Sequence, residues 1–302
     1  MISLLIPVFN EKEAIEETIA LAHEVFSKID EEFEILVIND GSTDGTDQIL
    51  TKQHPDNVHI LTHPINRGYG ASMKTGIRRA RGDLIAITDA DGTYPIVDFP
   101  KLLEAMQQGD ADMIVGARTK KGVQMPLIRK PAKWVINRLV NWVTGMKIPD
   151  NNSGMRIFKK QMAEEFMHLY PQGFSFTITI TLAAITSDYL VQYVPIDYFK
   201  RKGSSSMSSG FNGIKNFLFF LGLITRITTY FKPLKFFMWP SVLMIITGIS
   251  YISYTLKLDA NISDAGMLLL LTGIQIGLFG LLAEVVVRQG RAKRPYKCSP
   301  MG

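Results

Sequence analysis

The amino-acid sequence predicts an α/β fold followed by a membrane-anchoring segment. Along residues 1–120, short apolar runs alternate with stretches of helical periodicity, and polar turns that contain glycine follow the apolar runs. This alternation is typical of a doubly wound sheet, whose parallel strands are apolar on both faces. Two longer apolar runs lie nearer the C-terminus. The chain is therefore expected to combine a globular α/β unit with a membrane part.

The expected strands and helices follow one another regularly in the first part of the chain. Strands are expected at residues 2–8, 34–39, 58–62, 84–88 and 112–116, where apolar side chains are concentrated. The first helix is expected to open at residues 9–11 and to run to about Lys28, because Ile15, Ile19 and Phe26 recur at helical spacing. A helix is expected after the polar turn at residues 40–46, and another at residues 71–81, after a glycine-containing turn.

Two aspartates follow the expected strand at residues 84–88. Asp89 and Asp91 are separated by one small residue, at the point where the apolar run breaks into turn chemistry. Open α/β sheets bind ligands just beyond the carboxyl ends of their strands. Two carboxylates this close repel each other unless a hard divalent cation binds between them and a diphosphate. The alternative is a strand-end turn, because aspartate and glycine both favour turns.

Composition and missing motifs exclude several classes of protein. No G-x-G-x-x-G follows the first strand and no G-x-x-x-x-G-K-[ST] occurs, which argues against a dinucleotide oxidoreductase and an NTPase. The net charge is +5, and the basic clusters flank apolar segments, which favours a membrane partner over nucleic acid. Cys298 is the only cysteine, so neither an internal disulfide nor a cysteine-based metal site is expected.

Four short segments occur in a fixed order at residues 7–11, 39–46, 66–68 and 89–91. Together they resemble the family 2 glycosyltransferases with the GT-A fold, a Rossmann-like nucleotide-diphospho-sugar transferase fold. The resemblance implies that the donor nucleotide sugar is bound by Pro7, Asn10, Glu11, Asp40, Arg67, Gly68, Asp89 and Ala90. It also implies that Asp89 and Asp91 hold Mg²⁺ or Mn²⁺ on the donor diphosphate. For Asp40 a helix cap is the alternative, and for Arg67 a solvated surface charge.

Basic residues then crowd the chain from residue 118 onward. Within the family, this part resembles the polyprenyl-phosphate branch, which includes dolichol-phosphate mannose synthases. The resemblance implies that the acceptor phosphate is bound by Arg118, Arg129, Ser153, Arg156 and Arg201. Asp91 is an expected catalytic residue because it would hold the metal ion. Arg118 and Arg129 are expected catalytic residues because arginine pairs well with phosphate. A solvated basic surface is the alternative. The chain departs from the branch at Thr93, where many members have glutamine.

The C-terminal part reads as a membrane hairpin. Residues 234–256 and 266–287 are apolar runs of about the ~20 residues that a membrane span needs. Lysines precede the first run and a basic tail follows the second. The positive-inside rule therefore places both ends, and the catalytic domain, on the cytoplasmic face. Glu284 lies near the cytoplasmic end of the second run, where snorkelling accounts for it.

The expected organisation follows from these segments. A GT-A catalytic domain is expected at residues 1–210, interfacial amphipathic helices at 211–233, and an integral membrane hairpin with a basic tail at 234–302. The state of association is open, and a homo-oligomer is compatible with a small two-span anchor.

The resemblance implies an inverting transfer of a hexose from a UDP- or GDP-linked sugar to a polyprenyl phosphate such as dolichyl or undecaprenyl phosphate. Transfer to a lipid that is not a phosphate is one alternative. A catalytically silent membrane scaffold that binds nucleotide sugars is another. A processive polysaccharide synthase would carry a Q-x-x-R-W signature and more spans, and the sequence contains neither.

Overall fold

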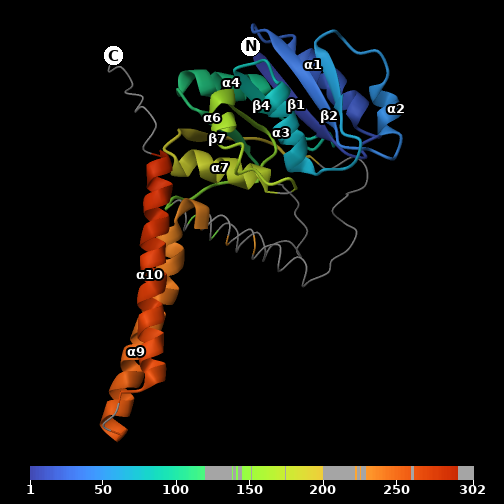
Figure 1. Cartoon of the computed structure of the whole chain (residues 1–302). Helices are drawn as coiled ribbons and strands as arrows, with labels where there is room; N and C mark the ends of the chain where they lie inside the picture. Colours follow the sequence, from blue (N-terminus) through green and yellow to red (C-terminus); the bar gives the residue numbers. More distant parts are fainter. Residues whose placement is uncertain are drawn as a thin grey trace. The chain divides into compact units, whose positions relative to one another are not determined.

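A computed structural model describes residues 1–119, 138, 141, 145–150, 152–173, 175–199, 222, 225, 229–259 and 262–291. The chain divides into two compact units, residues 1–212 and residues 213–302. The first unit holds a β-sheet with its covering helices, and the second holds two long helices (Figure 1). The expected interfacial helices at residues 211–233 lie almost entirely outside the described residues.

The first unit is built on a seven-stranded sheet in the order β3-β2-β1-β4-β6-β5-β7. Its strands are β1 (Ile2–Val8), β2 (Phe33–Asn39), β3 (Val58–Thr62), β4 (Leu84–Ile87), β5 (Met113–Ala117), β6 (Arg156–Lys159) and β7 (Val191–Pro195). Neighbouring strands are parallel except around β6, which runs antiparallel to both β4 and β5. The expected α/β class is confirmed, while β6 and β7 were not among the expected strands.

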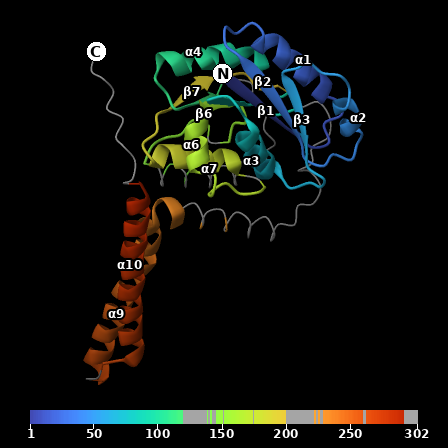
Figure 2. The same cartoon turned by 45° about the horizontal axis from the view of Figure 1, so that its top comes forward.

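Helices cover both faces of this sheet. They are α1 (Ile15–Phe26), α2 (Thr46–Leu50), α3 (Tyr69–Arg79), the short 3₁₀ turn η1 (Ile96–Asp98), α4 (Phe99–Gln108), α6 (Lys160–Glu165) and α7 (Phe176–Thr186). In Figures 1 and 2, α1 and α4 lie on one face and α3, α6 and α7 on the other. Alternate residues of β1 explain this, because Ile2 and Leu4 join the core with α1, whereas Leu5 faces α3.

The close packing of α3 on the sheet depends on one glycine. A Cβ added to Gly76 would lie 2.9 Å from Leu5 Cδ1 and 3.2 Å from Ile38 Cδ1. Contacts this short are tight, so a larger residue would require the ends of the Leu5 and Ile38 side chains to move. The position of α3 matters because its first turn lies at the carboxyl edge of the sheet.

Helix α7 has no polar face. Residues 176–184 are all buried, so the helix is covered on every side by protein. Its threonines carry the polar contacts: Thr177 Oγ1 donates to Asn152 Oδ1 at 2.7 Å, and Thr181 Oγ1 donates to the carbonyl of Thr177 at 2.8 Å. The helix therefore offers buried oxygen atoms to the segment that leads into β6.

The second unit is a hairpin of α9 (Pro233–Asp259) and α10 (Asp264–Arg291). Stretches of 26 and 24 residues in these helices are apolar and long enough to cross a membrane. Small residues let the two helices approach closely: a Cβ on Gly248 would lie 2.8 Å from Leu270 N, and Ser241 Oγ donates to the carbonyl of Gly273 at 2.7 Å. Large apolar side chains such as Leu243 and Phe279 face outward.

Glu284 has a structural partner inside this hairpin. Its Oε2 accepts the main-chain N–H of Leu234 at 3.4 Å, in the first turn of α9. The first N–H groups of a helix have no partner within the helix, and a carboxylate there is also favoured by the helix dipole. The contact gives this acidic side chain a role in joining the ends of the two helices.

Candidate functional site at the carboxyl edge of the sheet

Three aspartates of the expected site lie at one edge of the sheet. Asp40 directly follows β2, while Asp89 and Asp91 follow β4. Both strands are parallel to β1, which lies between them, so their carboxyl ends meet at the same edge. This is the edge at which open α/β sheets bind ligands.

The loops after β1 and β2 are tied to each other by hydrogen bonds. Asn10 N donates to Ser42 Oγ at 3.1 Å, and Thr43 N donates to Asn10 Oδ1 at 2.7 Å. Glu11 N donates to Thr46 Oγ1 at 3.1 Å. Asn10 takes a positive φ of 57°, which asparagine tolerates better than most residues. The segment 7–11 and the segment 39–46 therefore form one rigid rim of the site.

Asp40 is held almost entirely by the protein. Its Oδ1 accepts Arg67 N at 3.0 Å and its Oδ2 accepts Gly68 N at 2.7 Å. The ring of His63 lies 2.7 Å away, from Nδ1 to Oδ1. Only one lone pair of this carboxylate is left for a ligand, so its main contacts are with the loop that leads into α3.

The N-terminus of α3 is closed by main-chain oxygens. Ala71 N donates to the carbonyl of Gln172 at 2.7 Å, and Gly70 N donates to that of Gly173 at 3.1 Å. A Cβ on Gly70 would lie 2.1 Å from the carbonyl oxygen of Pro171, so no side chain fits there. Helix N-termini commonly bind phosphate through these N–H groups. Here they are already used, and the Asp40 carboxylate occupies the neighbouring amides.

Arg67 is the exposed cation at this end of α3. Its main-chain N–H binds Asp40, while its side chain is exposed and has no ion-pair partner within the described ranges. An arginine in this position is able to contact an anion bound at the edge of the sheet.

The two aspartates after β4 are held in different ways. Asp91 is buried, and its Oδ1 accepts both Thr93 N at 3.1 Å and Thr93 Oγ1 at 2.6 Å. Asp89 is half-buried against Gly154, where an added Cβ would lie 2.8 Å from Asp89 Oδ2. Over the part of the chain that the structure describes, no group of three or more His, Cys, Asp or Glu side chains could hold a metal ion.

Two tyrosines line the surroundings of Asp89. Tyr94 Oη accepts the main-chain N–H of Gly154 at 2.7 Å. Burial, together with the negative charge of Asp89, raises the pKa of Tyr94 above its ordinary range and does the same for Tyr69. Both phenols therefore keep their protons at physiological pH, and neither adds a negative charge beside the carboxylate.

Arg118 is paired with Asp150, a residue to which no role was assigned from the sequence. Arg118 Nε and Nη2 donate to the Asp150 carboxylate at 2.7 and 3.0 Å, and Arg118 N adds a bond at 3.1 Å. The guanidinium also lies 5.2 Å from the ring centre of Tyr198. Burial opposes both charges, but the hydrogen bonds outweigh it, so the pKa of Asp150 is lowered and that of Arg118 is raised.

Arg156 does not reach the surface. It is fully buried, and its guanidinium donates to the carbonyls of Ser153 and Thr177 and to Thr181 Oγ1. These acceptors are neutral, and burial lowers the pKa of Arg156. Ser153 Oγ is likewise buried and has no hydrogen-bond partner within the described residues. Both side chains are therefore buried, and the Arg156 guanidinium is bound by oxygen atoms of the protein.

Two expected site residues, Arg129 and Arg201, lie outside the described residues, as do the lysines beside them.

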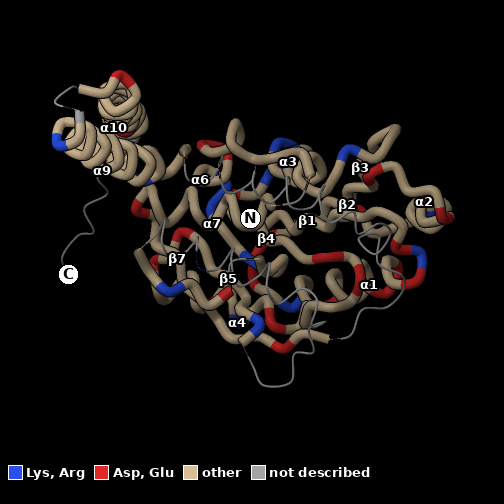
Figure 3. Tube along the Cα trace, turned by 90° about the horizontal axis from the view of Figure 1, so that it is seen from below, with Lys and Arg blue, Asp and Glu red and all other residues tan. Residues whose placement is uncertain are grey.

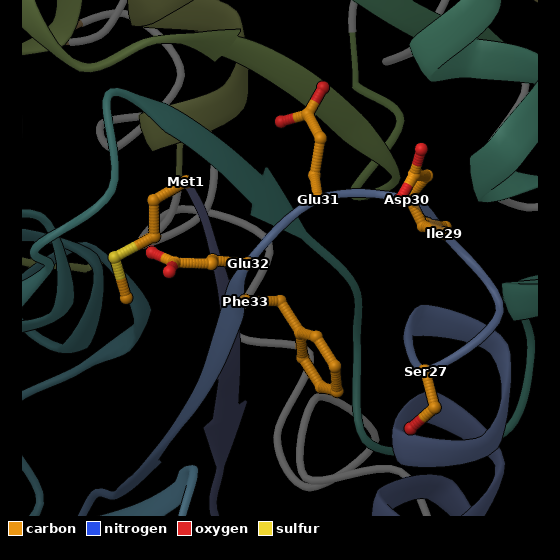
Figure 4. Close-up of a pocket in the computed structure, with 7 residues that line it drawn as sticks. All are labelled: Met1, Ser27, Ile29, Asp30, Glu31, Glu32 and Phe33. Atoms are coloured by element: carbon orange, nitrogen blue, oxygen red, sulfur yellow. The ribbon is translucent and has the colours of Figure 1, made fainter.

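At the opposite edge of the sheet, where β1 and β2 begin, a surface pocket is lined by Met1, Phe33 and the acidic residues Asp30, Glu31 and Glu32 (Figure 4). Three carboxylates do not suit a diphosphate. Figure 3 shows further acidic positions along α1, whereas α3 carries basic ones.

Comparison with known families decides the class of the protein. Residues 3–167, more than half of the chain, match Glycosyl transferase family 2. The chain belongs to glycosyltransferase family 2. Residues 232–288 match the GtrB C-terminal hairpin, the segment that forms α9 and most of α10.

A curated relative of this family 2 glycosyltransferase is the low-salt glycan biosynthesis hexosyltransferase Agl6 of Haloferax volcanii. The two are 31% identical over 224 residues, which cover 73% of this chain and 53% of the relative. The chain thus spans about half the length of that relative. The family model supports glycosyl transfer as the class of activity.

Solved structures show the same fold at low identity. Glucosyl-3-phosphoglycerate synthase from Mycobacterium tuberculosis, solved with Mn²⁺, UDP and phosphoglyceric acid, has a TM-score of 0.57 and 14% identity, over 76% of this chain and 77% of that one. S. aureus TarS, solved with UDP-GlcNAc, has a TM-score of 0.55 and 17% identity, over 75% and 66%. The expected GT-A fold is confirmed by these neighbours.

Sequence reasoning missed three residues that organise the site of this glycosyltransferase: His63, Tyr94 and Asp150. His63 comes directly after β3 and so obeys the same strand-end rule that identified the aspartates. Tyr94 lies three residues after Asp91, and Asp150 opens the segment that ends at Arg156. Tyr94 had no local signal, whereas Asp150 belongs to the same segment as Ser153 and Arg156, and only its pairing with Arg118, 32 positions away, could not be predicted.

Proposed function

We propose that this family 2 glycosyltransferase transfers a hexose from a UDP- or GDP-linked sugar to a polyprenyl phosphate. Family membership and the Haloferax hexosyltransferase support the transfer of a hexose. The match to the GtrB hairpin, with two helices long enough to cross a membrane, supports a lipid acceptor. Solved neighbours that bind UDP or UDP-GlcNAc support a nucleotide-sugar donor.

The observation that carries the proposal is the closed N-terminus of α3 beside the two aspartates of β4. Because carbonyls of Gln172 and Gly173 occupy the amides of this helix, a diphosphate has no main-chain cradle there. Asp89 and Asp91 offer instead the oxygen ligands that Mg²⁺ or Mn²⁺ accept, and such ions commonly take one or two carboxylates together with substrate phosphates. A cation bound there would stabilise the negative charge on the departing nucleoside diphosphate.

The reaction needs little proton transfer. An oxygen of the acceptor phosphate forms a bond to the anomeric carbon while the bond from that carbon to the donor diphosphate breaks, which inverts the anomeric centre. A phosphate dianion is already a nucleophile near neutral pH, so no strong base is required. Alignment and charge neutralisation then supply most of the catalysis, with Asp91 as the residue on which transfer depends most.

Arg118 is the described arginine best placed to contact a phosphate. Asp150 takes its Nε and one Nη2 hydrogen, which leaves the Nη1 hydrogens for an anion. Arg129 and Arg201 are proposed as further ligands of the acceptor phosphate. For Ser153 and Arg156 we propose a supporting role, because Arg156 is fully buried and binds the carbonyl of Ser153. Pro7, Asn10, Glu11, Asp40, Arg67 and Ala90 are proposed to line the donor site.

The proposal includes a place for the protein in the cell. The hairpin spans the membrane, and the catalytic unit lies on the cytoplasmic face, where nucleotide sugars are made. The basic residues that flank the apolar runs support this orientation. Association of copies through the hairpin remains part of the proposal.

The test uses the full chain in detergent, Mg²⁺ or Mn²⁺, a short polyprenyl phosphate and a panel of radiolabelled UDP- and GDP-sugars. Label is expected to enter the organic phase only when both metal and lipid phosphate are present. Asp91→Asn is expected to reduce transfer by about a hundredfold or more. Asp83→Asn is the matched control, because Asp83 is exposed at the other end of β4.

Other outcomes would replace the proposal. Label that enters diacylglycerol but not polyprenyl phosphate would establish a non-phosphate lipid acceptor. Binding of a nucleotide sugar without transfer to any lipid would establish a silent scaffold. Full activity of Asp91→Asn would remove the metal site from the proposal.

A further inference from the structure

His63 is a buried side chain beside the site that neither the family resemblance nor the comparisons assign to any role. It follows β3, the edge strand of the sheet, and only 7% of its surface is exposed. Its Nδ1 lies 2.7 Å from Asp40 Oδ1, and its Nε2 lies 2.9 Å from Thr75 Oγ1. The ring therefore joins three elements: the edge strand, the end of β2 and the middle of α3.

The hydrogen-bond partners determine which nitrogen donates. Asp40 already accepts the main-chain N–H groups of Arg67 and Gly68, so its carboxylate acts as an acceptor. The Nδ1 of His63 must then carry the hydrogen of the contact to Asp40. The hydroxyl of Thr75 can donate to Nε2 or accept from it, and in either case the contact fixes the orientation of the ring.

The contact to His63 limits the movement of the Asp40 side chain. Asp40 lies at the end of a strand and would otherwise be held only by the loop that it organises. That loop is tightly placed, because Gly68 has a φ of 94° and a Cβ there would lie 2.9 Å from the carbonyl oxygen of Gln172. His63 thus fixes Asp40 from the side of the protein interior, and Asp40 fixes the amides at the start of α3.

We propose that His63 is a positioning residue for donor binding. It holds Asp40 against the amides of Arg67 and Gly68 and so sets the exposed Arg67 side chain where the donor diphosphate binds. His63 itself touches neither donor nor acceptor. The link to the donor rests on the proposed function, whereas the effect on the loop does not.

The test compares His63→Ala with His63→Asn, whose amide retains a donor near the position of Nδ1. His63→Ala is expected to raise the KM for the donor about tenfold, with the KM for the lipid phosphate unchanged, as is typical when a supporting hydrogen bond is lost. His63→Asn is expected to recover most of that loss. Thr75→Val removes the partner of Nε2 and is expected to give a smaller rise. His59→Asn, on the same strand and partly exposed, is the matched control.

A second measurement does not depend on transfer. Hydrogen exchange of the Arg67 and Gly68 amides is expected to speed up about tenfold in His63→Ala and to stay near the wild-type rate in His63→Asn. If His63→Ala leaves this exchange and the donor KM unchanged, or changes the two KM values equally, the proposal is wrong. If exchange responds as expected while the wild-type chain transfers no sugar, the proposed function fails and the positioning role stands.

Discussion

The two sides of the candidate site hold their buried charged groups through different kinds of partner. On the β2–β3 side, Asp40 is held by two main-chain amides and the ring of His63. On the β5–β6 side, Arg118 is paired with a carboxylate and Arg156 with neutral oxygens only. The first side contains no buried arginine, whereas the second contains two side chains whose positive charge is removed from water.

This difference separates ligand binding from stability. Main-chain amides hold a carboxylate without a buried cation, so the β2–β3 side keeps Arg67 exposed for an anion. A buried guanidinium needs its partners, because an uncompensated charge in the interior is strongly destabilising. We therefore expect the loss of a partner of these arginines, at Asp150 or Thr181, to act mainly on folding, and substitutions on the β2–β3 side to act mainly on donor binding.

The largest expected effect is on the Arg118–Asp150 pair. Asp150→Ala leaves Arg118 buried without its partner and is expected to lower the free energy of unfolding by about 3–5 kcal/mol. Asp40→Ala leaves no buried arginine without a partner, so this variant is expected to lose only about 1–3 kcal/mol of the free energy of unfolding. Denaturant unfolding of both variants, followed by circular dichroism, compares the two sides directly. Equal losses would contradict the distinction, and the double variant Arg118→Met, Asp150→Leu should recover part of the larger one.

The next effect concerns Gly154, which packs against Asp89. Gly154→Ala places a Cβ about 2.8 Å from Asp89 Oδ2 and must displace that carboxylate. The concentration of Mn²⁺ that gives half-maximal transfer is expected to rise about 10–100-fold, as for other residues that orient metal ligands. Gly173→Ala is the control, because nothing lies within 4 Å of the added Cβ. An unchanged metal requirement in Gly154→Ala would show that Asp89 is not a ligand.

A smaller effect is expected at the oxygen atoms around Arg156. Thr181→Val removes one of its acceptors and is expected to cost about 1.5–3 kcal/mol of stability, since the lost bond is to a charged donor. The KM values of donor and acceptor are expected to stay within a factor of about two. Thr179→Val, also buried in α7, is the comparison. A selective rise in the KM for the acceptor would instead indicate that Arg156 binds the acceptor phosphate directly.

The smallest effect near neutral pH is the acid dependence of folding. Burial opposes the charge of Asp150, but the hydrogen bonds and charge of Arg118 outweigh it and lower the pKa of Asp150 below its ordinary 3.8. The folded state therefore binds this proton less tightly than the unfolded state. The resulting stability is complete above the ordinary value and is lost as the pH falls through the lowered one. Melting temperatures between pH 6 and pH 2 should fall less steeply in Asp150→Asn.

Part of the architecture could be predicted from the sequence because its signals are local. The third strand lies at 58–62 as expected, and the first five strands occur in the expected order. Helix α3 begins at Tyr69 instead of residue 71, because carbonyls from residues 172 and 173 accept the amides of its first turn. Helix α1 begins at Ile15 and not at residues 9–11, because the amides of Asn10 and Glu11 bind Ser42 and Thr46 in the segment after β2. These boundaries were decided by partners far away in the sequence.

The remaining elements had no clear local signal. β6 has only four residues, and it exists because β4 and β5 pair with it on both sides. Helix α7 alternates threonine and isoleucine, which is typical of a strand, yet it folds as a helix whose residues 176–184 are buried and whose Thr177 and Thr181 oxygens accept from Arg156.

By itself the sequence determined the α/β class, the two aspartates after β4 and the apolar hairpin, because apolar periodicity and strand-end polarity are properties of neighbouring residues. Only the tertiary structure decided that the N-terminus of α3 is closed, that Arg118 is paired with Asp150, that Arg156 is buried and that His63 supports Asp40. Each of these depends on contacts between residues more than 20 positions apart or on different elements. Such contacts form only when the sheet brings its strand ends together.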